Sequence, residues 1–429
     1  MKKIIQWLLK ILAKWIVLRY QPEIIGITGS AGKTSTREAV FAVLSVKYST
    51  RQTIKNYNNE FGLPLTIIGV SSPGSSLWGW FLVIRRAISL LLVKDKNYPE
   101  ILVLEYGIDR PGDMFYLLSI ARPQFGILTL IGPSHLEFFG NLEKVEREKG
   151  LLLKSITPNG WAIINADDER CRSVAKNVSS KVISFGFNDK ATVRAVEIFF
   201  GFEHEASGSN LRGVSFKLSY DGSVVPVLLP QVLGYGAIYA ALAAAAIGVA
   251  KGINLIDISQ ALRNIELPRG RMTLIEGKNN TTIIDDTYNA SPEPVMSALR
   301  YLGKVPMGIN ARRVAILGDM KELGSFSVEG HRLVGQVVYE NSIDVLIVVG
   351  ELAKEIGASA NKVGLSKEKL FQFDNATTAS EYLKNHLIEG DVILIKGSQS
   401  MRMERIVKSI MAEPTKAKDL LVRQDWTDA

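Results

Sequence analysis

A short glycine-rich string near the start of the chain carries the strongest chemical signal. It reads Gly26-Ile-Thr-Gly29-Ser-Ala-Gly32-Lys33-Thr34, between an apolar run and a helical pattern. In such a strand–turn–helix, backbone N–H groups approach phosphate oxygens, the lysine adds positive charge, and the threonine hydroxyl can bind Mg²⁺. Ile27 replaces the first glycine of the strict phosphate-loop pattern, so a chance glycine turn is the competing interpretation. The spacing favours ATP binding by seven residues: Gly29, Ser30, Ala31, Gly32, Lys33, Thr34 and Ser35.

Alternating strand-like and helical segments surround this loop. Apolar runs predict strands at residues 24–28, 101–105, 126–130, 161–165 and 182–185. Amphipathic patterns predict helices at residues 33–46, 113–121, 143–156 and 237–252. This alternation is typical of a mostly parallel sheet covered by helices. Residues 190–230 differ, because short alternating runs at 214–218 and 224–229 indicate a small antiparallel patch.

A stretch rich in Pro, Gly and Arg at residues 267–272 separates this block from a second one. Strand patterns resume at residues 282–286, 314–317, 345–349 and 392–395, as in a doubly wound domain. We therefore expect an α/β protein with four parts. These are a helix in 1–22, a central phosphate-loop domain in 23–267, a Rossmann-like domain in 268–412 and a polar tail in 413–429.

The composition excludes several classes of protein. Apolar residues make up 47% and charged residues 22% of the 429, so ordinary cores can form and global disorder is not expected. Cys171 is the single cysteine, which excludes an internal disulfide and gives no support for a Cys/His zinc cluster. The reducing cytoplasm is the expected compartment. The net charge of +8 fits anionic substrates or a membrane surface, but no basic block interleaved with aromatics indicates nucleic-acid binding.

The first twenty residues predict an amphipathic helix. Lys3, Lys10 and Lys14 fall on one side of a helical wheel, and the uninterrupted apolar run is too short to span a bilayer. No cleavage site for a secretory signal follows. The pattern fits two alternatives equally well: peripheral contact of residues 1–20 with the inner face of the membrane, or docking on the protein itself.

Further strings follow the predicted strands and helices. In order they are Asn56-Tyr-Asn58-Asn59-Glu60-Phe-Gly62-Leu-Pro64, Glu105-Tyr-Gly107, Gly132-Pro-Ser-His135-Leu-Glu137-Phe-Phe-Gly140, Glu148-Lys149-Gly150, Pro268-Arg269-Gly-Arg271, Asp285-Asp286-Thr287-Tyr288-Asn289-Ala-Ser291-Pro292, Leu317-Gly-Asp319-Met-Lys-Glu-Leu-Gly324 and Lys396-Gly-Ser398-Gln-Ser400-Met401. With the phosphate loop, this ordered set resembles the ATP-dependent Mur ligases of peptidoglycan synthesis. Within that family it is most similar to the branch that adds D-alanyl-D-alanine to the UDP-N-acetylmuramoyl tripeptide.

The resemblance implies an amide ligase that works through an acyl phosphate, with ATP and two Mg²⁺ ions. Thr34 and Glu105 would hold the first ion, since hard cations prefer oxygen ligands. His135 and a carbamylated Lys149 would hold the second. A buried polar histidine and a solvated lysine are the competing structural interpretations for these two residues.

The resemblance also assigns roles around the metals. Asn59 and Glu60 would face the γ-phosphate and the reacting carboxylate, and Arg271 would reach the ATP phosphates. Asp286 and Asn289 would contact the nucleotide. Candidates for the second substrate are Ser291, Lys396, Ser398 and Ser400, for which a loop-and-cap cluster is the alternative.

The sequence departs from the family pattern in two places. Only about 25 residues precede the phosphate loop, so we expect no separate domain for the UDP-sugar. The family's Gly-x-His-Asn-x-x-Asn string is replaced by Gly234-Tyr-Gly236-Ala237-Ile-Tyr-Ala240, which bears on adenine binding. The leading hypothesis is a monomeric ligase acting on a cell-wall precursor and D-alanyl-D-alanine. A related Mur-type or folylpolyglutamate-synthase-like ligase, and a nucleotide-binding scaffold without chemistry, stay open as alternatives.

Overall fold

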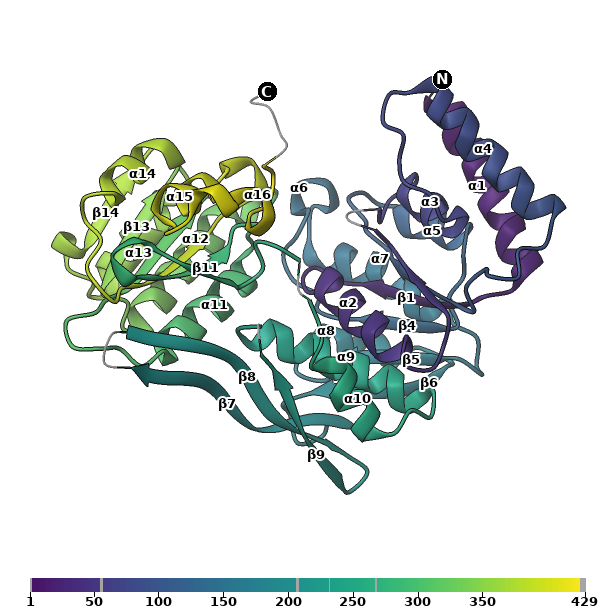
Figure 1. The fold of residues 1–429 in the computed structure, drawn as a ribbon, viewed down its shortest axis with the longest axis horizontal. Helices are drawn as coiled ribbons and strands as arrows, with labels where there is room; N and C mark the ends of the chain where they lie inside the picture. Colours follow the sequence, from purple (N-terminus) through teal and green to yellow (C-terminus); the bar gives the residue numbers. More distant parts are fainter. Residues whose placement is uncertain (1, 55–56, 206–207, 231, 267, 425–429) are drawn as a thin grey trace.

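The computed structural model describes residues 2–54, 57–205, 208–230, 232–266 and 268–424. The chain forms two sheet-centred bodies that lie side by side (Figure 1). We call them the first body, built on a nine-stranded sheet, and the second body, built on a six-stranded sheet. The α/β class expected from the strand–helix alternation is confirmed.

The nine-stranded sheet has the order β2-β3-β1-β4-β5-β6-β7-β8-β9. Its strands are β1 Glu23–Thr28, β2 Thr50–Gln52, β3 Ile101–Glu105, β4 Phe125–Leu128, β5 Trp161–Asn165, β6 Lys181–Gly186, β7 Val193–Glu205, β8 Gly208–Tyr220 and β9 Ser223–Leu229. The first six strands in this order, including β1, pair in parallel, and β7 also pairs with β6 in parallel. Strand β8 is antiparallel to both β7 and β9. The parallel strands are apolar along nearly their whole length because helices cover both faces.

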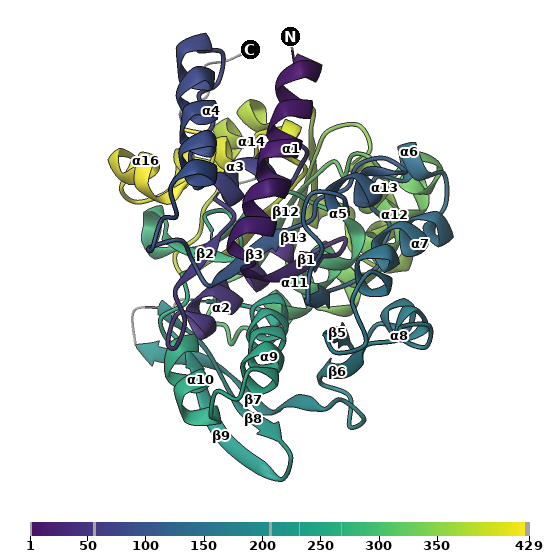
Figure 2. The same cartoon turned by 90° about the vertical axis from the view of Figure 1, so that its right-hand side faces the viewer.

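Ten helices of the described residues belong to the first body. They are α1 Lys2–Tyr20, α2 Lys33–Leu44, α3 Gly62–Ile68, α4 Leu77–Leu92, α5 Asp113–Leu118, α6 Leu136–Phe139, α7 Leu142–Lys154, α8 Glu169–Ala175, α9 Tyr235–Ala250 and α10 Leu255–Leu262. One core packs α2, α9 and α10 on one face of the sheet, and the other packs α1, α3, α4, α5 and α7 on the opposite face. Helices α1 and α4 stand together at the edge farthest from the second body (Figures 1 and 2).

The six-stranded sheet has the order β10-β11-β15-β12-β13-β14, and only β10 runs antiparallel to its neighbour. Its strands are β10 Thr273–Glu276, β11 Thr282–Asp286, β12 Arg313–Gly318, β13 Val345–Val349, β14 Leu370–Phe373 and β15 Val392–Lys396. The helices are α11 Pro292–Lys304, α12 Ser327–Glu340, α13 Lys354–Val363, α14 Ala376–Leu383, α15 Glu404–Ile410 and α16 Ala417–Leu420. Short 3₁₀ turns lie at Lys278–Asn280, Gly324–Phe326, Lys367–Lys369, Gln399–Met401 and Pro414–Lys416.

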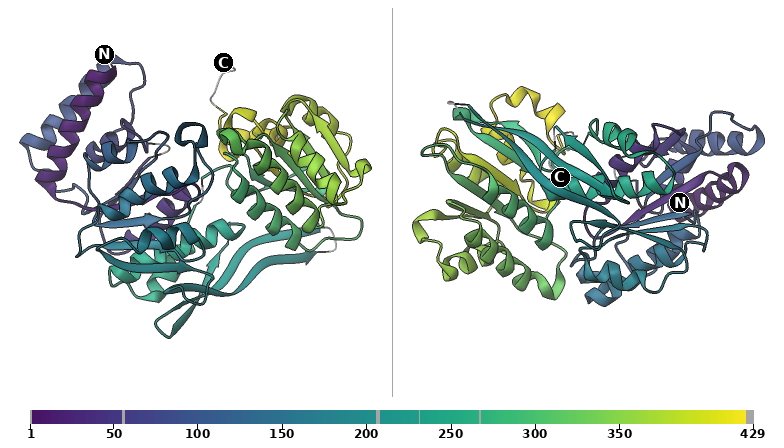
Figure 3. Two further views of the ribbon diagram at one scale, coloured as in Figure 1. Left: turned by 180° about the vertical axis from the view of Figure 1, so that it is seen from behind. Right: turned by 90° about the horizontal axis from the view of Figure 1, so that it is seen from below.

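The antiparallel strands connect the two bodies. The expected small patch is instead a long extension of the first sheet, since β7 and β8 each have 13 residues and reach beneath the second body (Figure 3). At their far end Phe200 packs edge-on against Tyr301 of α11, with ring centroids 5.0 Å apart. Short alternating runs predict short strands, and such runs do not reveal that one sheet continues past the body in which it starts.

The C-terminal segment and the junction between the two bodies bear on the expected domain bounds. The segment expected as a polar tail contains a short helix, α16, and the buried side chain of Arg423 pairs with Glu404 at 2.7 Å; residues 425–429 lie outside the described chain. The expected boundary at residue 267 also lies outside it, between the two sheets in sequence. Among the described residues, no helix combines the length and the apolar character needed to cross a membrane.

Candidate active site

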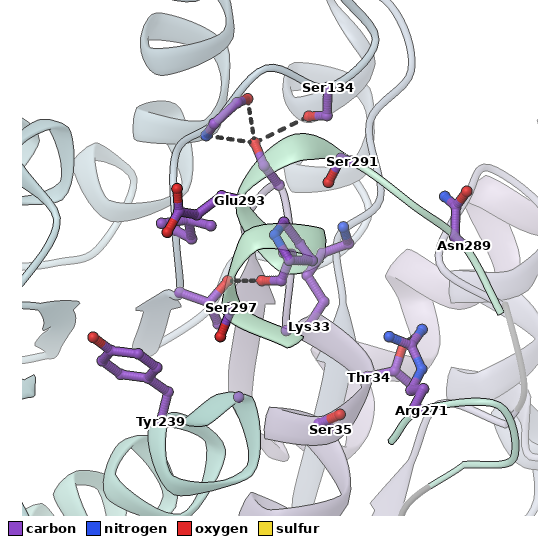
Figure 4. Close-up of a pocket in the computed structure, with 18 of the residues that line it drawn as sticks. Lys33, Thr34, Ser35, Ser134, Tyr239, Arg271, Asn289, Ser291, Glu293 and Ser297 are labelled. Carbon is purple, nitrogen blue, oxygen red and sulfur yellow. Dashed lines mark hydrogen bonds between the residues drawn. The ribbon is translucent and has the colours of Figure 1, made fainter. Parts of the chain in front are cut away.

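A cavity of about 690 Å³ lies where the two bodies meet (Figure 4). The first body contributes residues that follow β1, β4 and β5, Glu105 at the end of β3, and the start of α9. The second body contributes residues just before β10, residues after β11 and β12, Lys396 at the end of β15, and the first turns of α11. Carboxyl ends of parallel strands are where open α/β sheets bind ligands, and here two such edges face one cavity.

The glycine-rich loop joins β1 to α2 at the cavity wall. Gly29 has φ 151° and Gly32 has φ 80°, conformations that favour glycine. A Cβ at Gly29 would stand 1.9 Å from the Thr129 hydroxyl, so the loop can lie this close to β4 only without a side chain. The Ser30 hydroxyl accepts from Gly132 N and donates to its carbonyl at 3.0 and 2.9 Å. The loop is therefore held open as a cradle of backbone N–H groups, which fits polyphosphate.

Glu105 and Thr34 form a pair of oxygen donors beside the loop. Thr34 Oγ1 donates to Glu105 Oε2 at 3.3 Å, and Asn58 Nδ2 donates to Glu105 Oε1 at 3.1 Å. Arg37 Nη1 lies 3.5 Å from Glu105 Oε2, so the buried carboxylate is ionically paired. An anionic oxygen next to a hydroxyl is the donor set that Mg²⁺ prefers.

Two lysines converge on one backbone oxygen of the loop. Lys33 Nζ donates to Gly29 O at 2.7 Å and Lys149 Nζ donates to the same oxygen at 3.2 Å. Burial and then the neighbouring Lys33 charge hold the pKa of Lys149 well below its usual range, and burial also lowers the pKa of Lys33. Lys149 does not line the cavity itself; it lies behind the loop on α7. Burial favours the neutral form of this amine, which is the form that reacts with CO₂.

His135 lies at the start of α6, in the left-handed conformation with φ 55°. Its Nδ1 is 2.8 Å from Glu322 Oε2 of the second body, and its Nε2 is 3.7 Å from Asp109 Oδ1. The His135 hydrogen bond holds the pKa of Glu322 below its usual range. No set of three His, Cys, Asp or Glu side chains among the described residues has the geometry of a metal site.

Arg271 brings a positive charge from the segment between the two sheets. Its Nη2 donates to Thr34 Oγ1 at 3.2 Å, and its guanidinium lies 4.2 Å from the centroid of the Tyr288 ring. The side chain thus reaches from this segment to the phosphate loop of the first body (Figure 4).

The end of β11 carries the second body's polar groups. Lys396 Nζ lies 2.7 Å from Asp286 Oδ2 and donates to Asn289 O at 2.9 Å. Burial raises the pKa of Asp286, and the Lys396 charge opposes this shift. Asn289 and Ser291 also line the cavity, Ser291 at the N-terminus of α11 (Figure 4).

Six residues expected at the site are not among those that line the cavity: Gly29 and Lys149, which adjoin the loop, and Asn59, Glu60, Ser398 and Ser400. Asn59 is exposed and its Oδ1 accepts from Phe61 N and Gly62 N, so it caps α3. Glu60 follows it away from the cavity, and the neighbouring Asn58 points inward instead. Ser398 is buried and accepts from Lys321 N at 2.8 Å, while Ser400 is exposed on a 3₁₀ turn. Consecutive loop residues point in different directions, which a sequence string cannot resolve.

The cavity also has a polar and aromatic corner that the sequence analysis did not assign. Tyr239 of α9 donates to Asp167 Oδ2 at 2.9 Å, and Phe187 lies 4.6 Å from the Tyr239 ring. Glu293 and Ser297 of α11, in the second body, also line the cavity (Figure 4). Asp167 follows the end of β5, so the rule on strand ends could have found it. Tyr239 lies in the string 234–240, where the family's His and Asn residues are absent, and its hydroxyl supplies a polar group at this place.

Comparison with known proteins places this geometry in a family. The Mur ligase middle domain matches residues 86–248, and the Mur ligase glutamate ligase domain matches residues 270–399. A relative from Buchnera aphidicola (subspecies Baizongia pistaciae), UDP-N-acetylmuramoyl-tripeptide–D-alanyl-D-alanine ligase, is 30% identical over 409 residues, covering 95% of this chain and 79% of the relative. The structure resembles MurF from Acinetobacter baumannii (TM-score 0.75, 27% identity, 94% of this chain and 80% of that one). It also resembles MurF ligase from Thermotoga maritima in complex with ADP (TM-score 0.74, 27% identity, 94% and 82%).

Proposed function

The chain belongs to the Mur ligase family, and from this premise we propose that it is an ATP-dependent ligase of peptidoglycan precursor synthesis. It joins D-alanyl-D-alanine to a UDP-N-acetylmuramoyl tripeptide, as the names of its relatives describe for those proteins. One observation carries the proposal. A single cavity gathers Lys33, Thr34 and Glu105 of the first body with Arg271 and Lys396 of the second.

The reaction makes one amide bond at the expense of one phosphoanhydride bond. A carboxylate oxygen of the tripeptide attacks the γ-phosphorus of ATP, the β–γ bond breaks, and ADP leaves. The amine of D-alanyl-D-alanine then attacks the acyl carbon, loses a proton, and displaces phosphate. Phosphoryl transfer of this kind depends mainly on positioning and on neutralising charge.

The phosphate loop supplies the fixed part of that charge neutralisation. Backbone N–H groups of residues 31–34 and the Lys33 ammonium bind the polyphosphate, and Arg271 adds a second cation from the segment between the two sheets. Thr34 and Glu105 would hold one Mg²⁺, which would supply positive charge to the phosphate oxygens. The glycine conformations and the paired oxygen donors support this fit.

A second Mg²⁺ would be held by His135 and a carbamylated Lys149. The buried, weakly basic amine of Lys149 supports carbamylation, because a neutral amine is the nucleophile that takes up CO₂. The modification would place an anion beside the Lys33 ammonium at Gly29 O, so the Lys33 charge would attract the modified side chain. The His135 imidazole faces the carboxylates of Asp109 and Glu322, and their negative charge would attract a metal cation.

The second body binds the remaining groups. Asp286 accepts from the ribose hydroxyls and Asn289 contacts the nucleotide, while Ser291 and Lys396 face the incoming amine substrate. Asn59, Glu60, Ser398 and Ser400 do not line the cavity, and their roles stay predictions. The substrates are small molecules, the proposed compartment is the cytoplasm, and the proposed form is a monomer.

The test is a substrate panel with two readouts, phosphate release and the mass of the product. The proposal predicts phosphate release that requires both the UDP-N-acetylmuramoyl tripeptide and D-alanyl-D-alanine, with one amide product. Turnover without either substrate would indicate a simple ATPase. Turnover with a folate and glutamate would indicate a folylpolyglutamate-synthase-like ligase. ATP binding without turnover on any substrate would indicate a scaffold.

A further inference from the structure

Helices α1 and α4 form a pair at the outer edge of the first body, and we call them the outer helix pair (Figures 1 and 2). They are more than fifty residues apart in sequence, yet Tyr20 at the end of α1 donates to Leu90 O of α4 at 3.0 Å. Each helix buries one face in the same core. The buried side chains are Leu9, Leu12, Ala13, Ile16, Val83, Ala87 and Leu90.

The opposite face of α1 is apolar as well. Ile4, Trp7, Trp15 and Leu18 recur at a spacing that puts them on one side of a helix, away from the buried side chains. Between 55% and 69% of each is exposed. Docking on the protein, one of the two alternatives for this segment, therefore uses only half of its apolar surface.

Helix α4 repeats the arrangement. Trp78, Phe81, Ile88 and Leu92 share its outward side, and the rings of Trp78 and Phe81 stack at 5.2 Å in solvent. Trp78 and Leu92 are 68% and 75% exposed, values unusual for large apolar side chains. Because both inner faces belong to one core, both outer faces point away from the same body.

The charge on these two helices is positive throughout, and one of their cations, Arg86, pairs with Asp95 beyond the end of α4 at 2.7 Å. Neither α1 nor α4 contains an acidic residue. Lys3, Lys10 and Lys14 flank the α1 stripe, and Arg85 lies within the α4 stripe. A shallow hollow beside Arg85 is lined also by Leu82, Arg86 and Ser89, so guanidinium and aliphatic groups meet there. Exposed tryptophan and leucine bordered by cations is the pattern of a helix that lies in a membrane interface.

We propose that the outer helix pair docks on the surface of a bilayer that contains anionic phospholipids. Both helices lie on the surface, since neither can cross the bilayer. A second copy of this chain is a poorer occupant. A twofold contact would set the lysines of one pair against those of the other, without a carboxylate on either helix to compensate. A lipid surface supplies the opposite charge and an apolar layer together.

Vesicle flotation of the full chain tests the proposal. The probes are vesicles of phosphatidylcholine alone and vesicles of phosphatidylcholine and phosphatidylglycerol in equal parts. We expect binding to the anionic vesicles, weakened by salt because the Debye length falls from about 10 Å at 0.1 M to about 3 Å at 1 M. The double variant Trp7→Ser/Trp78→Ser should bind at least about tenfold more weakly. The triple variant Lys3→Gln/Lys10→Gln/Lys14→Gln should lose roughly a hundredfold, about fivefold for each cation.

A matched control is Ile256→Ser, which removes a side chain that is 61% exposed on α10, a helix that packs on the opposite face of the sheet. It should bind vesicles as the unchanged protein does. Circular dichroism and ATP-dependent turnover report whether each variant is folded. The proposal is overturned if the unchanged protein fails to float with anionic vesicles at low salt, or if the folded tryptophan variant binds equally well. Concentration-dependent self-association that the tryptophan variant abolishes, without vesicle binding, would assign the surface to a second copy instead.

Discussion

Replacing Glu105 with glutamine changes one charge at the centre of the candidate site and almost no volume. The carboxylate accepts from Thr34 and Asn58 and pairs with Arg37, so both of its oxygens face donors. A glutamine NH₂ in either position would meet a donor instead of an acceptor. One hydrogen bond is lost and a second buried donor is left without a partner.

Three quantities should change in this variant: the free energy of unfolding, the Mg²⁺ requirement and kcat/KM. Leaving a buried polar group unpaired costs about 1–3 kcal/mol of folding free energy. Loss of an anionic ligand should raise the apparent Mg²⁺ requirement by at least about tenfold, because ligand charge sets the affinity for hard cations. Removing a preorganised electrostatic contact costs about 2–4 kcal/mol in the transition state, a ~30- to 1000-fold fall in kcat/KM. Phosphate release at graded Mg²⁺ and urea unfolding measure these quantities separately.

Glu38→Gln is the matched control. Glu38 pairs with the same Arg37 and accepts from Gln52 at 2.7 Å, but it does not touch Thr34. We expect a stability change of at most about 1 kcal/mol and an unchanged Mg²⁺ dependence. If Glu105→Gln retained the Mg²⁺ dependence and the turnover of the unchanged protein, the assignment of Thr34 and Glu105 as a metal pair would be wrong.

Three further predictions concern other charges. Lys149→Met should abolish product formation without lowering the urea midpoint at pH 7. In the unchanged protein the folded-state pKa of Lys149 is depressed, so the unfolded chain binds more protons and stability rises as the pH rises toward 10.5. A Lys149→Met variant with full activity would exclude the carbamate. Burial raises the pKa of Asp285 from 3.8 to about 6, so the folded chain binds more protons and this group costs about 2–3 kcal/mol of stability as pH rises through that window. Urea unfolding between pH 4 and 6 should show a shallower fall for Asp285→Asn, and equal slopes would contradict the assignment. Arg271→Ala should lower kcat/KM for ATP about a hundredfold, whereas Arg269→Ala, whose side chain donates to Lys418 O at the surface, should stay within about twofold; equal losses would remove the special role of Arg271.

The N-terminal helix illustrates why pattern alone left two alternatives open. Periodicity gave an apolar side and a basic side, which fits docking on the protein or on a membrane. The structure shows two apolar stripes on opposite sides of α1, one buried and one exposed. Only the position of the neighbouring core decides which stripe is covered, and that core is made from residues far away in sequence.

The candidate site shows the same limit at the level of single side chains. The strings predicted which loops meet, because strand ends of a parallel sheet share one edge. They did not predict that Asn58 would face Glu105 while Asn59 caps α3, since adjacent loop residues differ only in backbone dihedral angles. The pairing of His135 with Glu322 was also not foreseen, because it joins two bodies across 187 residues of chain.

The sequence by itself determined the α/β class, the phosphate loop and the family, because local periodicity and short strings depend on neighbouring residues. Tertiary structure alone decided which polar groups share the cavity, that Lys33 and Lys149 converge on Gly29 O, and that two separate helices present one outward apolar surface. Those outcomes depend on the packing of long-range contacts, whose free energies are small individually and are fixed only when the whole chain folds.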